Sequence, residues 1–258
     1  MRTRLIACTT YAVVAASILF FSAAAASAEV KVMISGGFSA AYLDLVPVFE
    51  RASGHSVTTA RGGSMGTAPT SIPSRLQRGE PVDVFIMVGD ALEELAKQGK
   101  VAAATRVDLA RSSIGMAVRT GLPKPDISSV DAFKRAMLEA KSIAYSSSAS
   151  GVYLSTELFP RLGIADQVKG KSKMIGAAAA AQGEADVALQ QVSELLPVAG
   201  LDFVGPLPAE IQKITVFSAG IAAGAANPDA GKLLIQFLAS PQAAAAIAKS
   251  ALEPMSAR

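Results

Sequence analysis

The sequence contains few of the residues that usually carry nucleophilic or metal chemistry. Among its 258 residues it has one cysteine, one histidine and no tryptophan, and aromatic residues make up only 5%. Cys8 falls in the predicted leader described below, so the mature chain is expected to have no disulfide, no thiol nucleophile and no cysteine metal ligand. His55 stands directly before a predicted strand, in a stretch that is typical of a surface connection.

Zinc-type clusters, Ser-His-Asp triads and phosphate-binding loops are absent from the sequence. Any catalysis must therefore use carboxylate, tyrosine or lysine groups, and no metal or other cofactor is expected.

Basic clusters are also lacking once the N-terminus is set aside. The full chain has 24 Lys and Arg against 21 Asp and Glu, a formal net charge of +3. Arg2 and Arg4 lie in the leader, which leaves a net charge of +1 for the rest. Nucleic-acid binding needs a concentrated positive face, so no nucleic-acid partner is expected. An anionic ligand would have to be held by local geometry.

The N-terminus has the pattern of a cleaved signal peptide. Arg2 and Arg4 precede the apolar run 5–21, and a small-residue stretch ends in Ala-Ser-Ala at 26–28. We predict cleavage after Ala28 and a periplasmic location. An uncleaved membrane anchor is the alternative, but threonines interrupt the run. No later segment approaches the roughly 20 apolar residues of a spanning helix.

The rest of the chain alternates short apolar runs with helical patterns, which indicates an α/β fold. Strands are predicted at 30–35, 56–60, 83–87, 113–119, 142–145, 186–189, 201–204 and 214–220. Helices are predicted at 40–51, 91–98, 129–140, 151–162, 177–181, 228–238 and 241–250. Two α/β units near 29–112 and 113–213 are therefore expected, with a C-terminal strand and helices after them.

Two glycine-rich loops follow the first two predicted strands. Ligands of open α/β sheets lie beyond the carboxyl ends of strands, where helix N-termini favour anions. The first loop contains Gly37, Phe38 and Ser39, and Ser39 is either a ligand or the N-cap of the next helix. The second contains Ser64, Met65 and Gly66, and its glycines mark either a ligand loop or only a turn.

A serine run between the strand at 142–145 and the next helix is the strongest anion-site candidate. The predicted ligand residues are Ser146, Ser150, Gly151 and Val152, with Ser150 able to cap the helix. The N–H groups of Gly151 and Val152 are expected to point at an oxyanion. A flexible polar linker is the alternative, but apolar periodicity resumes at once.

A fourth polar segment follows the strand at 186–189. The side-chain amides of Gln190 and Gln191 can bind carboxylates without adding charge. Glu194 is either a proton shuttle or an exposed first-turn glutamate of the next helix.

Two framework segments, 78–85 (RGEPVDVF) and 240–244 (SPQAA), resemble the molybdate-type group of periplasmic solute-binding proteins. That resemblance implies a two-lobed, type II (Venus flytrap) α/β fold with a ligand cleft between the lobes. It implies that the C-terminal tail rejoins the first unit, giving lobes 29–112 plus 214–258 and 113–213. Gln190 and Gln191 stand where the molybdate receptors place a tyrosine, which weakens the case for a tetrahedral metal oxyanion.

Further segments are similar to the periplasmic aconitate isomerases of bacteria, which belong to the same superfamily. They are SMGT at 64–67, MVG at 87–89, AYS at 144–146, SASGVYLS at 148–155, QQ at 190–191 and SEL at 193–195. The resemblance implies an isomerase that interconverts trans- and cis-aconitate by an allylic proton shift. Glu194 is then the expected base, and Tyr145 or Tyr153 the expected acid.

The alternative function is a non-catalytic receptor with the same fold. It would bind a tricarboxylate or a molybdate-like oxyanion and deliver it to the membrane subunits of an ABC transporter. Under either function the expected partner is a small anion.

Overall fold

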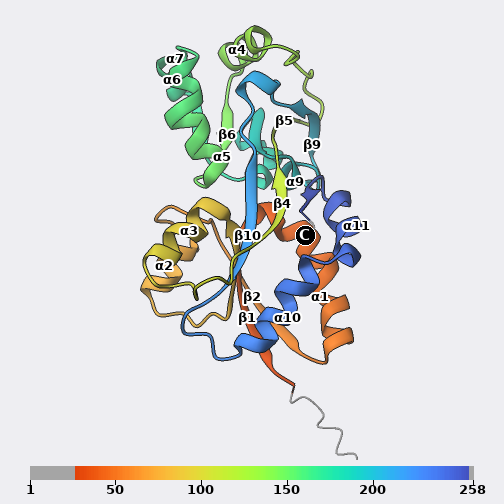
Figure 1. The fold of residues 1–258 in the computed structure, drawn as a ribbon. Helices are drawn as coiled ribbons and strands as arrows, with labels where there is room; N and C mark the ends of the chain where they lie inside the picture. Colours follow the sequence, from red (N-terminus) through yellow and green to blue (C-terminus); the bar gives the residue numbers. More distant parts are fainter. Residues whose placement is uncertain (1–26, 256–258) are drawn as a thin grey trace, which may run out of the picture.

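The computed structural model describes residues 27–255, which form two α/β units, each built on its own sheet (Figure 1). The predicted leader falls almost wholly outside these residues, as does Cys8. In the described part of the chain, no helix is both long and apolar enough to cross a membrane.

The first sheet has six strands and carries both the beginning and the end of the described chain. Its order is β11 (Glu253–Pro254), β4 (Val107–Ser112), β10 (Thr215–Ile221), β3 (Val84–Val88), β1 (Glu29–Ile34) and β2 (Ser56–Arg61). β1 runs parallel to β2 and β3, whereas β10 is antiparallel to β3 and β4. All five residues of β3 are apolar and buried, as expected for a strand covered on both faces.

The second sheet has five strands from the middle of the sequence. Its order is β7 (Ser172–Met174), β6 (Ile143–Tyr145), β8 (Val187–Gln191), β5 (Ile114–Arg119) and β9 (Leu201–Pro206). β6 is parallel to β7 and β8, and β5 is antiparallel to β8 and β9. A separate apolar core, which includes the fully buried Phe133 and Leu154, packs on this sheet.

The chain passes between the sheets twice. It leaves the first sheet between β4 and β5, where only Ser113 separates the strands, and it returns between β9 and β10. In Figure 1 the C-terminal helices lie beside the N-terminal ones, although most of the sequence separates them. We propose on this basis a division into lobe 1, residues 29–112 plus 214–258, and lobe 2, residues 113–213.

Helices cover both sheets. Lobe 1 contains α1 (Ser39–Ser53), α2 (Ile72–Gln77), α3 (Gly89–Lys97), α10 (Pro228–Leu238) and α11 (Pro241–Lys249), besides the 3₁₀ turn η1 (Gly36–Phe38). Lobe 2 contains α4 (Val130–Glu139), α5 (Ala149–Val152), α6 (Phe159–Arg161), α7 (Ala165–Lys169), α8 (Ala177–Ala179) and α9 (Val192–Leu195), the π-helical segments η2 (Tyr153–Leu158) and η3 (Ala180–Glu184), and the 3₁₀ turn η4 (Ala209–Ile211).

Several local features differ from the sequence prediction. The strand β4 was not predicted, and the helix predicted at 151–162 begins at Ala149 and contains a π-helical stretch. His55 is buried rather than on the surface, and its Nδ1 accepts a hydrogen bond from the Ala28 N–H at 3.2 Å. Its ring also lies 6.3 Å from that of Phe49, so it packs as a structural residue.

Candidate functional site

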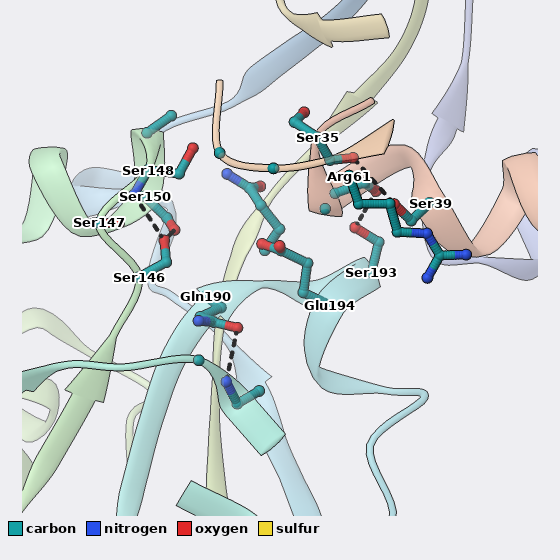
Figure 2. A pocket seen from close by; sticks show the side chains of 18 of the residues that line it. Ser35, Ser39, Arg61, Ser146, Ser147, Ser148, Ser150, Gln190, Ser193 and Glu194 are labelled. Carbon is teal, nitrogen blue, oxygen red and sulfur yellow. Dashed lines mark hydrogen bonds between the residues drawn. The ribbon is translucent and has the colours of Figure 1, made fainter. Parts of the chain in front are cut away.

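A cavity of about 680 Å³ lies between the two sheets and is lined by residues from both lobes. Its volume is in the range of small-molecule binding sites, roughly 300–1,000 Å³. Figure 2 shows the serines of the 146–150 loop on one side, Ser35 and Ser39 on the other, and Glu194 between them. The predicted loops 35–39 and 145–153 and the segment 190–194 thus all reach one cavity.

The first loop approaches the cavity through its glycines and serines. Gly37 and Ser39 line the cavity as predicted, and Ser35 and Gly36 line it too. Ser39 is the first residue of α1 rather than its N-cap, and its hydroxyl donates to the Ser35 carbonyl at 3.2 Å. Phe38 is fully buried in the lobe 1 core, so its side chain does not line the cavity.

The serine loop also lines the cavity, but with different roles for its members. The hydroxyl oxygens of Ser146 and Ser150 lie 3.3 Å apart, and both residues line the cavity. Ser148, rather than Ser150, occupies the N-cap position of α5. The Val152 N–H donates to the Ser148 carbonyl at 2.9 Å, so it is not free for an oxyanion as predicted. A Cβ on Gly151 would overlap the Ser146 carbonyl, which explains the glycine there.

The Ser64 loop contributes to the cavity through residues other than the predicted ones. Ser64 is buried, and its hydroxyl oxygen accepts a hydrogen bond from the Val88 N–H at 3.0 Å. Gly62 and Gly63 line the cavity, whereas Ser64, Met65 and Gly66 do not. Ser64 therefore holds the end of β3 in place, and the neighbouring glycines give the backbone its close approach.

Both glutamines after β8 lie in the cavity wall and are almost fully buried. Gln190 Oε1 accepts a hydrogen bond from the Ala177 N–H at 3.3 Å. Gln191 Nε2 donates to Thr215 Oγ1 at 2.9 Å, and Gln191 Oε1 has no hydrogen-bond partner in the described chain. The hydroxyl oxygen of Ser35 is likewise buried without a partner. Buried polar atoms without partners are uncommon in folded proteins, and these two lie where a ligand would bind.

Glu194 is the only acidic residue that lines this cavity in the described chain. It lies in the first turn of α9, and its side chain points into the cavity (Figure 2). Burial of the carboxyl group raises the pKa of Glu194 to about 7, and an interaction with the backbone of Gln191 acts in the opposite direction. The carboxyl is therefore close to half-ionised at neutral pH, the state in which a group can both take up and release a proton.

Glu194 also contacts the opposite lobe. A Cβ atom added to Gly36 would overlap Glu194 Oε1, so the backbone of lobe 1 at Gly36 lies directly against the carboxyl group. Next to it, the Ser193 hydroxyl donates to the Gly37 carbonyl at 2.7 Å and joins the two lobes directly.

The two predicted acids lie outside the cavity lining. The Tyr153 hydroxyl donates to the Ile211 carbonyl at 2.7 Å, and Lys213 Nζ lies 5.0 Å from the centre of its ring. Tyr145 packs its ring 6.1 Å from that of Phe159. Both tyrosines therefore contribute to the packing of lobe 2, and neither lines the cavity that contains Glu194.

The sequence reasoning missed Arg61, and it did not single out Ser35 or Ser193 within the predicted segments 35–39 and 190–194. Arg61 lines the cavity at the carboxyl end of β2 and is the only cationic residue that does so in residues 27–255. Its position after a predicted strand was the available signal. Within the same range, no group of three or more His, Asp or Glu residues could hold a metal ion.

Comparison with known proteins agrees with this geometry. A family model described as "Bacterial extracellular solute-binding protein" matches residues 30–252. An aconitate isomerase of Pseudomonas sp. is 47% identical over 231 residues, which is 88% of each chain. The molybdate-binding protein ModA of Azotobacter vinelandii is 29% identical over 246 residues, or 90% of this chain and 92% of that protein.

Solved structures with the same fold are also binding proteins. The periplasmic molybdate-binding protein of Azotobacter vinelandii superposes with a TM-score of 0.69 at 20% identity, over 86% of this chain and 98% of the other. The sulfate-binding protein SubI of Mycobacterium tuberculosis gives 0.69 at 19% identity, over 88% and 87%. The predicted two-lobed type II fold is thereby confirmed. This chain belongs to the bacterial extracellular solute-binding proteins, within their molybdate-type superfamily.

Proposed function

We propose that this protein is an isomerase that interconverts trans- and cis-aconitate in the cavity between its lobes. The observation that carries the proposal is Glu194, the single carboxyl group among the described residues of a cavity lined by hydroxyl and amide groups, with its pKa raised to about 7. A receptor has no need of such a base, since binding requires no preference for a transition state. The 47% identity to the Pseudomonas enzyme supports the same reaction.

The reaction needs only one base. The Glu194 carboxylate takes a proton from the methylene carbon of aconitate, which lies beside a carboxylate. The C–H electron pair joins the allylic system, and the double bond moves by one carbon. The same carboxyl group then returns the proton to the other end of the system. No atom is gained or lost, so no cofactor is required for the balance.

The rest of the cavity supplies polar groups for the added negative charge. Hydroxyl groups of Ser35, Ser39, Ser146 and Ser150 line the cavity, together with the amides of Gln190 and Gln191. Each hydrogen bond to a charged group contributes roughly 1.5–3 kcal/mol, so several of them offset the cost of desolvating a carboxylate. Because these hydroxyl and amide donors are neutral, they bind an anion without forming an ion pair with the Glu194 carboxylate.

The test is a conversion assay with purified residues 29–258. Separate samples start from pure trans-aconitate and from pure cis-aconitate, and both isomers are followed by chromatography. An isomerase brings both samples to one ratio of isomers, because a catalyst does not change an equilibrium. Failure of both samples to change, at every pH from about 5 to about 9, would remove the proposal.

A receptor is the second candidate, favoured by the membership of the solute-binding family and by the similarity to ModA. In that role the protein would bind a tricarboxylate or oxyanion after export to the periplasm, with its leader cleaved after Ala28. Delivery to the membrane subunits of an ABC transporter would follow. Binding without conversion in the assay above would support the receptor.

A further inference from the structure

Arg61 occupies a defined place at the edge of the cavity. It is the last residue of β2, and in the parallel ladder it pairs with Ile34, directly before Ser35. The Gly62 N–H donates to the Ile34 carbonyl at 3.0 Å and fixes the backbone there. Figure 2 shows Arg61 on the same side as Ser35 and Ser39, across the cavity from the serine loop.

The guanidinium of Arg61 has no protein partner within residues 27–255. Five other arginines of residues 27–255 lie within 4.0 Å of a carboxylate oxygen, whereas Arg51 and Arg135, like Arg61, do not; the five are Arg75, Arg78, Arg106, Arg111 and Arg119. The backbone carbonyl of Arg61 accepts a hydrogen bond from Arg75 Nη2 at 3.3 Å, which does not involve the guanidinium. Its side chain is exposed and keeps all five donors available.

The charged residues that line the cavity show why the unpaired guanidinium of Arg61 matters for binding an anion. Among the described residues, Arg61 and Glu194 are the only charged ones in the lining, and they have opposite signs. A polycarboxylate that enters the cavity therefore meets one attractive charge. A guanidinium is also the group whose paired N–H donors match the two oxygens of a carboxylate.

We propose that Arg61 is the carboxylate-recognition residue of this cavity, binding the carboxylate of a polycarboxylate that lies furthest from Glu194. The proposal rests on the isomerase function and names the part of the site that selects its substrate. A compact tetrahedral oxyanion held by the inner serines would leave most of the 680 Å³ unfilled and would not extend to the edge of the cavity. Arg61 thus favours extended polycarboxylates over such anions.

The test compares the wild-type protein with Arg61→Gln, Arg61→Lys and Arg51→Gln. Arg51 is the matched control, because it is an exposed arginine of the same lobe, twelve residues beyond Ser39 on α1 and therefore about 18 Å along the helix. The dissociation constant of trans-aconitate is measured by titration calorimetry at low and high NaCl. Thermal unfolding without ligand checks that each variant is folded.

We expect Arg61→Gln to weaken trans-aconitate binding roughly tenfold and to reduce its salt dependence. A larger loss is not expected, since the exposed side chain must be ordered on binding. Arg61→Lys keeps the charge and restores part of the affinity, and Arg51→Gln has wild-type affinity. In the conversion assay the loss falls mainly on KM.

Two results would overturn the proposal: an unchanged dissociation constant in Arg61→Gln, or an equal loss in Arg51→Gln. Its failure is separate from that of the isomerase function. If the wild type binds trans-aconitate without converting it and only the Arg61 variants bind weakly, the carboxylate site stands and the isomerase fails. If the wild type converts trans-aconitate and Arg61→Gln does so with the same KM, the isomerase stands and the carboxylate site fails. A wild-type protein that does not bind trans-aconitate would contradict both.

Discussion

Replacing Glu194 with glutamine removes the proposed base and keeps nearly the same shape. General base catalysis contributes typically 10²- to 10⁴-fold to a rate, so kcat of Glu194→Gln is expected to fall by about that factor. The serine hydroxyls and Arg61 that line the cavity are unchanged, so the dissociation constant of trans-aconitate should stay within a fewfold of wild type or improve. Any change in affinity should be towards tighter binding, because a neutral amide does not repel the anion as an ionised carboxylate does.

The same substitution should stabilise the free protein, in a pH-dependent way. The pKa of Glu194 is raised from 4.5 to about 7 because burial disfavours the charged form. Compared with Glu194→Gln, the wild type has a free energy of unfolding that falls as the pH rises from about 4.5 to about 7. Above that pH the difference between the two proteins is complete. The shift corresponds to at most roughly 3 kcal/mol, and each kcal/mol moves Tm by about 2–4 °C in a chain of this size.

Both effects are read from one pair of proteins. Tm is measured for wild type and Glu194→Gln at pH values from about 4.5 to about 8.5, and kcat at the higher values. The expected difference in Tm is small at the acid end and favours the variant at the alkaline end. A variant that keeps kcat within a fewfold of wild type would refute the assignment of the base. A Tm difference that does not vary with pH would refute the raised pKa.

Three other perturbations test the surroundings of this carboxyl group. In the wild type, kcat/KM should rise with pH through an inflection near 7, since only ionised Glu194 takes up a proton, and a profile that is flat there would count against it. Gly36→Ala places a methyl group on Glu194 Oε1, so it should displace the carboxyl group and lower kcat by roughly 10²-fold with the fold intact. The control Gly224→Ala adds a methyl group that has no atom within 4 Å and should keep the wild-type kcat. Equal kcat values in the two variants would be inconsistent with the contact between Gly36 and Glu194. Ser193→Ala removes the hydrogen bond to the Gly37 carbonyl and should lower the free energy of unfolding by about 1 kcal/mol in urea titrations, and an unchanged midpoint would show that the bond adds nothing.

The fold was largely predictable because most of its strands carry their own pattern. The buried run at 84–88 has five apolar residues in a row, and the helix α10 begins and ends at the predicted residues. β4 escaped prediction because Asp108 and Arg111 interrupt its apolar residues. Asp108 Oδ1 accepts hydrogen bonds from the neighbouring Arg106 Nε at 3.0 Å and from the Ser218 hydroxyl of β10 at 2.6 Å, and the second partner is brought there only by the fold.

The site was predictable at the level of loops and less so at the level of atoms. Ser39 follows β1 of the first sheet, and Ser150 and Glu194 follow β6 and β8 of the second, so the carboxyl ends of strands from both sheets bring these residues to the cavity between the lobes. The sequence does not indicate that the Ser64 hydroxyl oxygen accepts a hydrogen bond from the Val88 N–H, or that the Tyr153 hydroxyl donates one to the Ile211 carbonyl. Those bonds join segments far apart in the chain, so only the folded structure reveals which polar groups remain free for a ligand.

The most direct test of the proposed function follows trans-aconitate by proton NMR in one tube with the wild-type protein. We predict that the vinyl and methylene signals of cis-aconitate appear and grow at the expense of those of the trans isomer, until a fixed ratio is reached. Broadening of the trans-aconitate signals, with no cis-aconitate formed, would show binding without turnover and would contradict the isomerase.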